Sequence, residues 1–187
     1  MPSPLGHTLV SSSIYLFFKK DFSFKKDFRN LILFIGIGLL PDIDMLLVLL
    51  SRNIGIHRSV THSLIFVIFS SIVVYLFLKK LKILSFKNSF LLILSLLSAH
   101  LFCDFFTLDD ILHNGINLFY PFSKEYIPAP FYLFMGFDWR QFSTLFSFYM
   151  LKVIIREFII TAPFFILALL YINKTQLKEE VNIESQN

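Results

Sequence analysis

The stretch Asn88–Phe106, which reads NSFLLILSLLSAHLFCDFF, joins an apolar run to a histidine and an aspartate near its end. The run approaches the roughly 20 residues that a membrane-spanning helix needs. His100 and Asp104 are four residues apart, so on a helix they share one face, with Cβ atoms about 6 Å apart. This geometry suits two ligands of one metal ion, or one ligand and a residue that orients it. A plain His–Asp hydrogen bond inside a helical bundle explains the pair equally well.

Composition places the rest of the chain in the same environment. The 187 residues are 56% hydrophobic and include 25 phenylalanines, whereas only 16% are charged. The mean hydropathy is +0.70. A soluble domain of this length has too little interior for so much apolar side chain. We therefore expect an all-α protein, a polytopic membrane helix bundle of about four to five helices, with membrane lipids around it.

Domain organisation is simple, because the chain has neither internal repeats nor a low-complexity linker. We expect a single helical membrane domain over residues 1–175 and a polar C-terminal tail over 176–187. The formal net charge is +4. The lysines of the chain lie in short clusters beside apolar runs, which is typical of residues that set the orientation of a protein in the membrane. We therefore expect no nucleic acid partner. The single Cys103 cannot form an internal disulfide.

Apolar runs predict five helices, at about 5–18, 30–50, 59–78 and 88–106, with a last helix that begins after Arg140 and ends near Ile172. Pro41 should interrupt the second helix and Pro163 should kink the last. Ser59 is a suitable N-cap for the third. A long irregular stretch, rich in proline and glycine, separates the last two helices.

Helices that alternate in direction sort the charged residues by face. Eleven of the 17 lysines and arginines fall on one side, five in the first loop, four in the second and two in the tail. All five histidines fall toward the other side, together with Asp42, Asp44, Asp104, Asp109 and Asp110. The positive-inside rule makes the lysine-rich loops cytoplasmic. We therefore expect a multi-pass protein of the cell membrane whose histidine face points outward.

Two carboxylates follow the proline in Leu40-Pro41-Asp42-Ile43-Asp44. On an unbroken helix Asp42 and Asp44 would point to different sides, but Pro41 can start a new turn. The pair could simply cap a helix corner. Carboxylates beside leucine-rich segments are costly in a bilayer, however, and this favours a functional role.

The next cluster is His57-Arg58-Ser59-Val60-Thr61-His62-Ser63, whose two histidines are candidate metal ligands. Arg58 would suit an anionic, phosphate-bearing group, or it would pair with a site aspartate or with lipid head groups. His7 is a candidate because it falls on the same face as the other histidines.

Three further groups are weaker candidates. Asp109, Asp110 and His113 fit a solvated acidic loop as well as a site. Glu157 is either a buried partner of Arg156 or a late site ligand, and we favour the structural role.

Imidazole combined with carboxylate suits zinc, manganese or iron(II) better than calcium or magnesium. We expect a divalent metal, zinc first, as one or more ions. The candidate ligands are His7, Asp42, Asp44, His57, His62, His100 and Asp104.

These clusters, in this order, resemble the YdjM-like family of membrane-bound metal-dependent hydrolases. The matching pieces are Gly6-His7, the two clusters above, His100 to Asp104, and Gly115 with Leu118 to Phe122, so the resemblance covers about residues 1–125. This family is distantly similar to zinc-dependent phospholipases C and fungal single-strand nucleases. That similarity implies a phosphoester substrate and zinc ligands at His7, Asp42 or Asp44, His57 or His62, His100 and Asp104.

The chain departs from the family pattern at two places. Between Thr107 and Gly115 it has a longer insert than the family's Thr-x-x-Gly. Val153 lies four residues before Glu157, where the soluble relatives have a histidine.

The function that we expect is a membrane-bound hydrolase of a phosphoester, a small molecule or a lipid-linked substrate, which uses a metal-activated water. The catalytic residues would be Asp44, Arg58 and Asp104. One of Asp42, Asp44 and Asp104 would act as the general base or as an orienting group. Arg58 would hold the anionic group. A metal-ion transporter or channel is the alternative, because transporters bind ions on broken helices. A structural protein without chemistry is the third reading.

Overall fold

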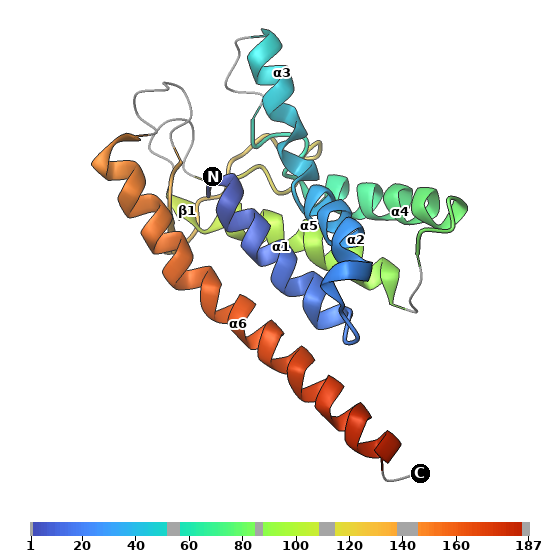
Figure 1. Ribbon diagram of the computed structural model, residues 1–187. Coiled ribbons are helices and arrows are strands. Elements are labelled where there is room, and N and C mark those ends of the chain that lie inside the picture. The colour runs from blue at the N-terminus through green and yellow to red at the C-terminus, as the bar shows by residue number, and fades with distance from the viewer. Residues whose placement is uncertain (1, 52–56, 85–87, 109–114, 138–145, 185–187) are drawn as a thin grey trace.

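The computed structural model describes residues 2–51, 57–84, 88–108, 115–137 and 146–184, and for 178–184 only the backbone is considered. The described chain is mostly helical (Figure 1). Its elements are α1 (Pro4–Phe18), α2 (Phe24–Gly38), the 3-10 helix η1 (Leu40–Ile43), α3 (Asp44–Ser51), α4 (Leu64–Lys80), α5 (Ser89–Phe105), β1 (Thr107–Leu108), β2 (Phe134–Met135) and α6 (Phe148–Glu184).

The first and fourth predicted helices are confirmed as α1 and α5. The interruption at Pro41 is also confirmed, since η1 separates α2 from α3 there. The all-α prediction missed β1 and β2, a pair of two-residue parallel strands in which Thr107 pairs with Phe134. This small sheet ties the end of α5 to the segment before α6.

Three predicted boundaries were wrong. The second helix begins at Phe24 rather than near Asn30, because Lys25, Lys26 and Arg29 are good helix formers whose side chains lie exposed there. The third begins at Leu64 rather than at Ser59. Residues 57–63 form turns instead, and the N-cap is Ser63, whose hydroxyl accepts from the Phe66 amide. The last helix continues through Pro163 and past Ile172 to Glu184, into the predicted tail.

Helix α1 is the centre of the packing, since it contacts α2, α5 and α6 (Figure 1). Tyr15 and Leu16 enter the main core, where Tyr15 stacks on Phe34 of α2 with ring centroids 5.2 Å apart. The preceding turn is Ser11–Ser13, three small side chains that are all buried. Small residues let helix backbones approach closely, as is common between helices in membranes.

The break after α2 places a helix end against α1. A Cβ atom on Gly38 would lie 2.1 Å from the Ser11 hydroxyl oxygen, so only glycine fits there. The axes of α2 and of the segment from Leu40 to Ser51 differ by 63°. The bend turns Asp42 and Asp44 away from the apolar outer face of α2. They lie instead toward α5, which contacts η1.

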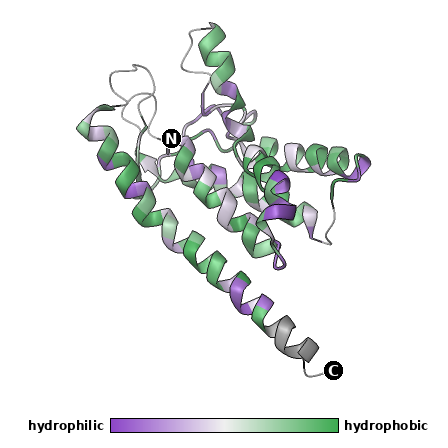
Figure 2. Cartoon of the chain, in the orientation of Figure 1, coloured by the Kyte–Doolittle hydropathy of each residue, from purple (hydrophilic) through white to green (hydrophobic). Residues whose placement is uncertain are grey.

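Many large apolar side chains lie on the outside of the described chain. On α3 and α4, Leu50 is 83% exposed and Phe69 is 66% exposed, and α6 is apolar over most of its length (Figure 2). By length and composition, the α6 segment 148–177 could cross a membrane, and α2 with α3 could form a second, broken span. Helix α5 is apolar but shorter.

The close approach of α1 and α2 makes a stability prediction. Gly38→Ala should lower the free energy of unfolding by about 1–3 kcal/mol, because the methyl group overpacks the contact with Ser11. Gly36→Ala is the matched control, since its Cβ would meet nothing within 4 Å and alanine is the better helix former by about 1 kcal/mol. Thermal unfolding in detergent, followed by circular dichroism, measures both.

The Gly38→Ala defect should be partly relieved by Ser11→Gly in the same chain. Equal melting temperatures for Gly38→Ala and Gly36→Ala would contradict the contact.

Candidate metal centre

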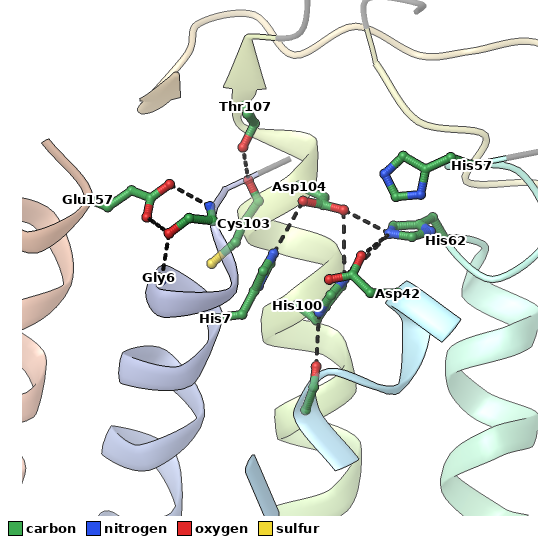
Figure 3. Close-up of polar contacts among 12 residues, drawn as sticks. Gly6, His7, Asp42, His57, His62, His100, Cys103, Asp104, Thr107 and Glu157 are labelled. Atoms are coloured by element: carbon green, nitrogen blue, oxygen red, sulfur yellow. Dashed lines mark hydrogen bonds and ion pairs between the residues drawn. The ribbon is translucent and has the colours of Figure 1, made fainter. Parts of the chain in front are cut away.

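Four segments that are distant in the sequence bring histidine and aspartate side chains together at one end of the helix bundle (Figure 3). They are the first turns of α1, the bend at η1 and the start of α3, the turns before α4, and the last turns of α5. All seven predicted metal ligands lie here, and six of them have their side chains buried, namely His7, Asp44, His57, His62, His100 and Asp104.

Asp104 is the buried anion at the middle of the cluster, with none of its side chain exposed. One carboxylate oxygen lies 2.7 Å from His62 Nε2 and 3.7 Å from His100 Nε2. The other lies 3.4 Å from His7 Nε2, and the His7 ring stacks on that of His100 with centroids 4.0 Å apart. The predicted i, i+4 pairing of His100 and Asp104 therefore exists, but both side chains also serve other segments.

The turn before α4 fixes which nitrogen of the His62 ring carries the proton. The Thr61 hydroxyl donates to Asp44 Oδ2 at 2.6 Å, so its oxygen can accept from His62 Nδ1, which is 3.0 Å away. With Nδ1 as the donor, the lone pair of a neutral His62 is on Nε2, which faces Asp104. Such outer contacts are how proteins orient metal-binding imidazoles.

His100 is oriented in the same way by the break in α2. Its Nδ1 donates to the Gly38 carbonyl at 2.9 Å, an acceptor that is free because the helix ends at that residue. The lone pair of His100 is then also on Nε2, and this atom lies 3.4 Å from His62 Nε2. Two lone pairs that face each other cannot form a hydrogen bond, so the pair calls for a shared cation or a proton.

Four donor atoms therefore face one point, the Nε2 atoms of His62 and His100 and one oxygen each of Asp42 and Asp104. Asp42 Oδ1 is 3.4 Å from His100 Nε2 and 3.7 Å from His62 Nε2. Ligands about 2.0–2.1 Å from a tetrahedral ion are about 3.4 Å apart. Two of the separations equal that value and two are 3.7 Å, and the shorter His62–Asp104 contact of 2.7 Å is the one that a bound ion would lengthen. The donor set fits a divalent cation.

A second group, Asp44, His57 and His62, also satisfies the spacing for a metal. Asp44 accepts from His57 Nδ1 at 2.9 Å and from the Thr61 hydroxyl, so both of its oxygens have partners. This arrangement orients the first set, although the His57 Nε2 atom is buried and accepts no hydrogen bond within the described residues.

The field of these carboxylates favours positive charge. Burial by itself would lower the pKa of His62, which precedes α4, but hydrogen bonds to Asp104, Asp42 and Asp44 outweigh that effect and raise the pKa well above its usual value. A proton therefore competes with a metal ion for this imidazole, and metal binding should weaken as the pH falls.

Arg58 lies inside the same cluster, with 1% of its surface exposed. Its φ angle of 62° is in the left-handed region that non-glycine residues rarely adopt. The Asn117 amide donates to its carbonyl at 3.3 Å, which attaches this turn to the segment after residue 115. The Arg58 charge acts favourably on the Asp104 carboxylate, which is the kind of attraction that the sequence allowed between Arg58 and a site aspartate.

Glu157 lies apart from the cluster, on the far side of Cys103 (Figure 3). Its carboxylate accepts from the Ser3 amide at 2.6 Å and from the Ser3 hydroxyl. Arg156 instead donates to the Leu133 and Tyr132 carbonyls, so the proposed Arg156–Glu157 pair is wrong. Glu157 anchors Ser3, the N-cap of α1, which lies one helical turn before His7. Asp109, Asp110 and His113 lie outside the described residues.

Sequence reasoning missed three contributors to the centre. Thr61 was quoted as part of its cluster without a role, and its place beside His62 was the available signal. The Gly38 carbonyl and the Ser3–Glu157 contact had none, since both depend on which segments meet in three dimensions.

The geometry predicts metal content. Wild-type protein should retain a divalent metal through purification, and the double variant His100→Ala, Asp104→Ala should not, because two of the four donors are gone. Cys103→Ala is the matched control on the same helix, since the thiol is outside the donor set. Elemental analysis decides between them, and equal metal in the wild type and the double variant would contradict the site.

The orienting contact predicts a smaller effect. Thr61→Val removes the acceptor of His62 Nδ1 and should weaken metal binding about 10–100-fold, measured by competition with a chelator. Thr175→Val is the control, because that hydroxyl bonds only within its own helix, to Tyr171. An unchanged affinity in Thr61→Val would remove the orienting role.

The comparison with protein families finds a match over nearly the whole chain. The family model described as YdjM inner membrane protein matches residues 1–179, a longer range than the 1–125 over which the motifs suggested a resemblance. No curated protein and no solved structure matches the chain significantly. With nearly its whole length matched, this chain belongs to the YdjM inner membrane protein family.

Proposed function

We propose that this protein is a membrane-bound, metal-dependent hydrolase of a phosphate-bearing substrate. The observation that carries the proposal is the convergence of two oriented imidazoles and two carboxylates on one point inside an apolar protein. Placing so many ionisable groups there is costly and is typical of a functional site. A divalent ion, zinc first for a His/Asp set, would supply a Lewis acid that activates water near neutral pH.

The chain's own residues divide the remaining work. Asp42 is the most accessible of the four donors, with 14% of its side chain exposed, so substrate and water reach the centre from its side, and we assign it the general base. Asp44 is engaged by His57 and Thr61 on both oxygens, and we assign it a positioning role in place of the catalytic role that the sequence suggested. Arg58 would attract the anionic group of the substrate, and Asp104 would hold Arg58 in place.

The activity test uses purified protein with zinc against phosphoesters of increasing chain length. Hydrolysis should fall to background in His100→Ala and stay near the wild-type rate in Ser98→Ala, because Ser98 is exposed and outside the donor set. Asp44→Asn should regain activity when metal is raised, because it weakens binding only, whereas Asp42→Asn should not. The proposal fails if no phosphoester is hydrolysed faster by the wild type than by His100→Ala.

We also propose a multi-pass arrangement, with the lysine-rich loops cytoplasmic and the metal centre facing outward. The positive-inside rule supports it, and so do the apolar α6 and the bent α2–α3 pair. In a Cys103→Ala background, a membrane-impermeant maleimide on intact cells should label Phe122→Cys, an exposed position in the segment whose Asn117 binds the Arg58 carbonyl, and not Lys20→Cys. Lysed cells should label both. Labelling of Lys20→Cys alone in intact cells would reverse the orientation.

One feature favours a second candidate, a metal-ion transporter. The 63° break between α2 and the segment that follows places Asp42 where transporters hold their ions, on a discontinuous helix. Uptake of metal into proteoliposomes, absent in His100→Ala, would support transport. A wild-type rate no faster than that of empty vesicles would leave the hydrolase.

A further inference from the structure

A cavity of about 490 Å³ lies between α1, α5, α6 and the segment at β2. It is within the range of roughly 300–1,000 Å³ that is typical of ligand sites. Its walls include Val10 and Ile14 of α1, Ala99 and Cys103 of α5, and Ile160 of α6. The proposed hydrolase does not use this space.

The lining presents carbon almost everywhere. Its two hydroxyl residues turn their polar atoms into their own helices, because Ser13 donates to the Leu9 carbonyl and Thr161 donates to the Glu157 carbonyl. The Cys103 thiol is a weakly polar exception. A cavity that offers a ligand no hydrogen bond selects for hydrocarbon.

The cavity opens toward the apolar exterior. Three of its lining phenylalanines are themselves exposed, Phe17 by 39%, Phe102 by 56% and Phe164 by 58%. In a family of inner membrane proteins, such an opening faces lipid chains rather than water. A chain can therefore enter from the bilayer without crossing an aqueous phase.

The α1 wall of the cavity continues the face of that helix that carries His7. Val10 and Ile14 are three and seven residues after His7, so the three side chains lie on one face of the helix. His7 in turn contacts Asp104 and stacks on His100. On α5, Ala99 and Cys103 line the cavity from a helix face next to the one that carries His100 and Asp104.

The roof of the cavity is held in place from two sides. Leu133 and Phe134 line it, and Arg156 of α6 binds the Leu133 carbonyl at 2.7 Å. The strand pair Thr107–Phe134 fixes the same segment to the end of α5. The roof is thus attached to α5 and α6, two of the three helices that form the walls.

We propose that this cavity holds one hydrocarbon chain of a phosphate-bearing membrane lipid, whose head group reaches the metal centre past His7. The proposal rests on the hydrolase function above for the fate of the head group, but the binding of the chain stands on the cavity alone. It narrows the substrate from phosphoesters in general to those of long-chain lipids.

Binding can be tested without activity. A phospholipid with a diazirine at the middle of one acyl chain, reconstituted with the protein and irradiated, should label the cavity segments of α1 and α6, as mapped by mass spectrometry. Ala99→Phe fills the cavity from α5 and should reduce this labelling at least fivefold. Ser98→Phe is the matched control, because Ser98 is exposed and does not line the cavity.

A second filling variant guards against a defect in folding. Ile160→Trp narrows the cavity from α6, away from the donor residues, and should act like Ala99→Phe while metal content stays at the wild-type level. Equal labelling in all variants, or labelling spread evenly over the exposed apolar faces, would mean ordinary solvating lipid and would overturn the site.

Kinetics then separate this proposal from the proposed function. Wild type should hydrolyse a long-chain phosphoester with a kcat/KM at least tenfold above that of a short-chain ester with the same head group, and Ala99→Phe should abolish the preference while the short-chain rate persists. Hydrolysis without any chain preference would overturn the cavity site and leave the hydrolase. Site-specific labelling without hydrolysis would support the cavity site and overturn the hydrolase.

Discussion

The fold depends on one buried carboxylate. Asp104 has no exposed surface, and an isolated charge in such a place would cost many kcal/mol. It is tolerated because His7 of α1 and His62 of the turn before α4 contact it, and because the charge of Arg58 in that same turn favours it. The start of α1, the turn before α4 and the end of α5 are thereby held to one point. Core packing then follows along the helices, with Tyr15 and the leucines of α5 filling the space behind the polar cluster.

Much of this was predictable, because the information lay in short range patterns. The apolar run over residues 88–106 with His100 and Asp104 one turn apart predicted both α5 and the paired ligands, and Pro41 predicted the break. The gathering of His7, His57 and His62 at the same end followed from helices that alternate in direction. The set of meeting side chains is confirmed by the structure, whereas their chemical roles remain predictions.

The remaining features arise from contacts between segments far apart in the chain. Ser59 is a residue type that is suited to an N-cap. Arg58 takes a left-handed conformation, however, and the helix begins only after Ser63. The Gly38 carbonyl becomes a partner of His100 only because α2 ends beside α5. Glu157 binds Ser3 across 154 positions. Local propensity carries no trace of such pairings, and tertiary packing decides them.

The contact between Glu157 and Ser3 has a consequence for how the molecule is assembled in the cell. Helix α1 is synthesised first and α6 last. The start of α1 therefore cannot be anchored until α6 exists, since the carboxylate that accepts from the Ser3 amide is on α6. His7 is one turn further on. The contact that anchors the start of α1 can therefore form only after α6 has been made, and a chain that ends before α6 lacks it.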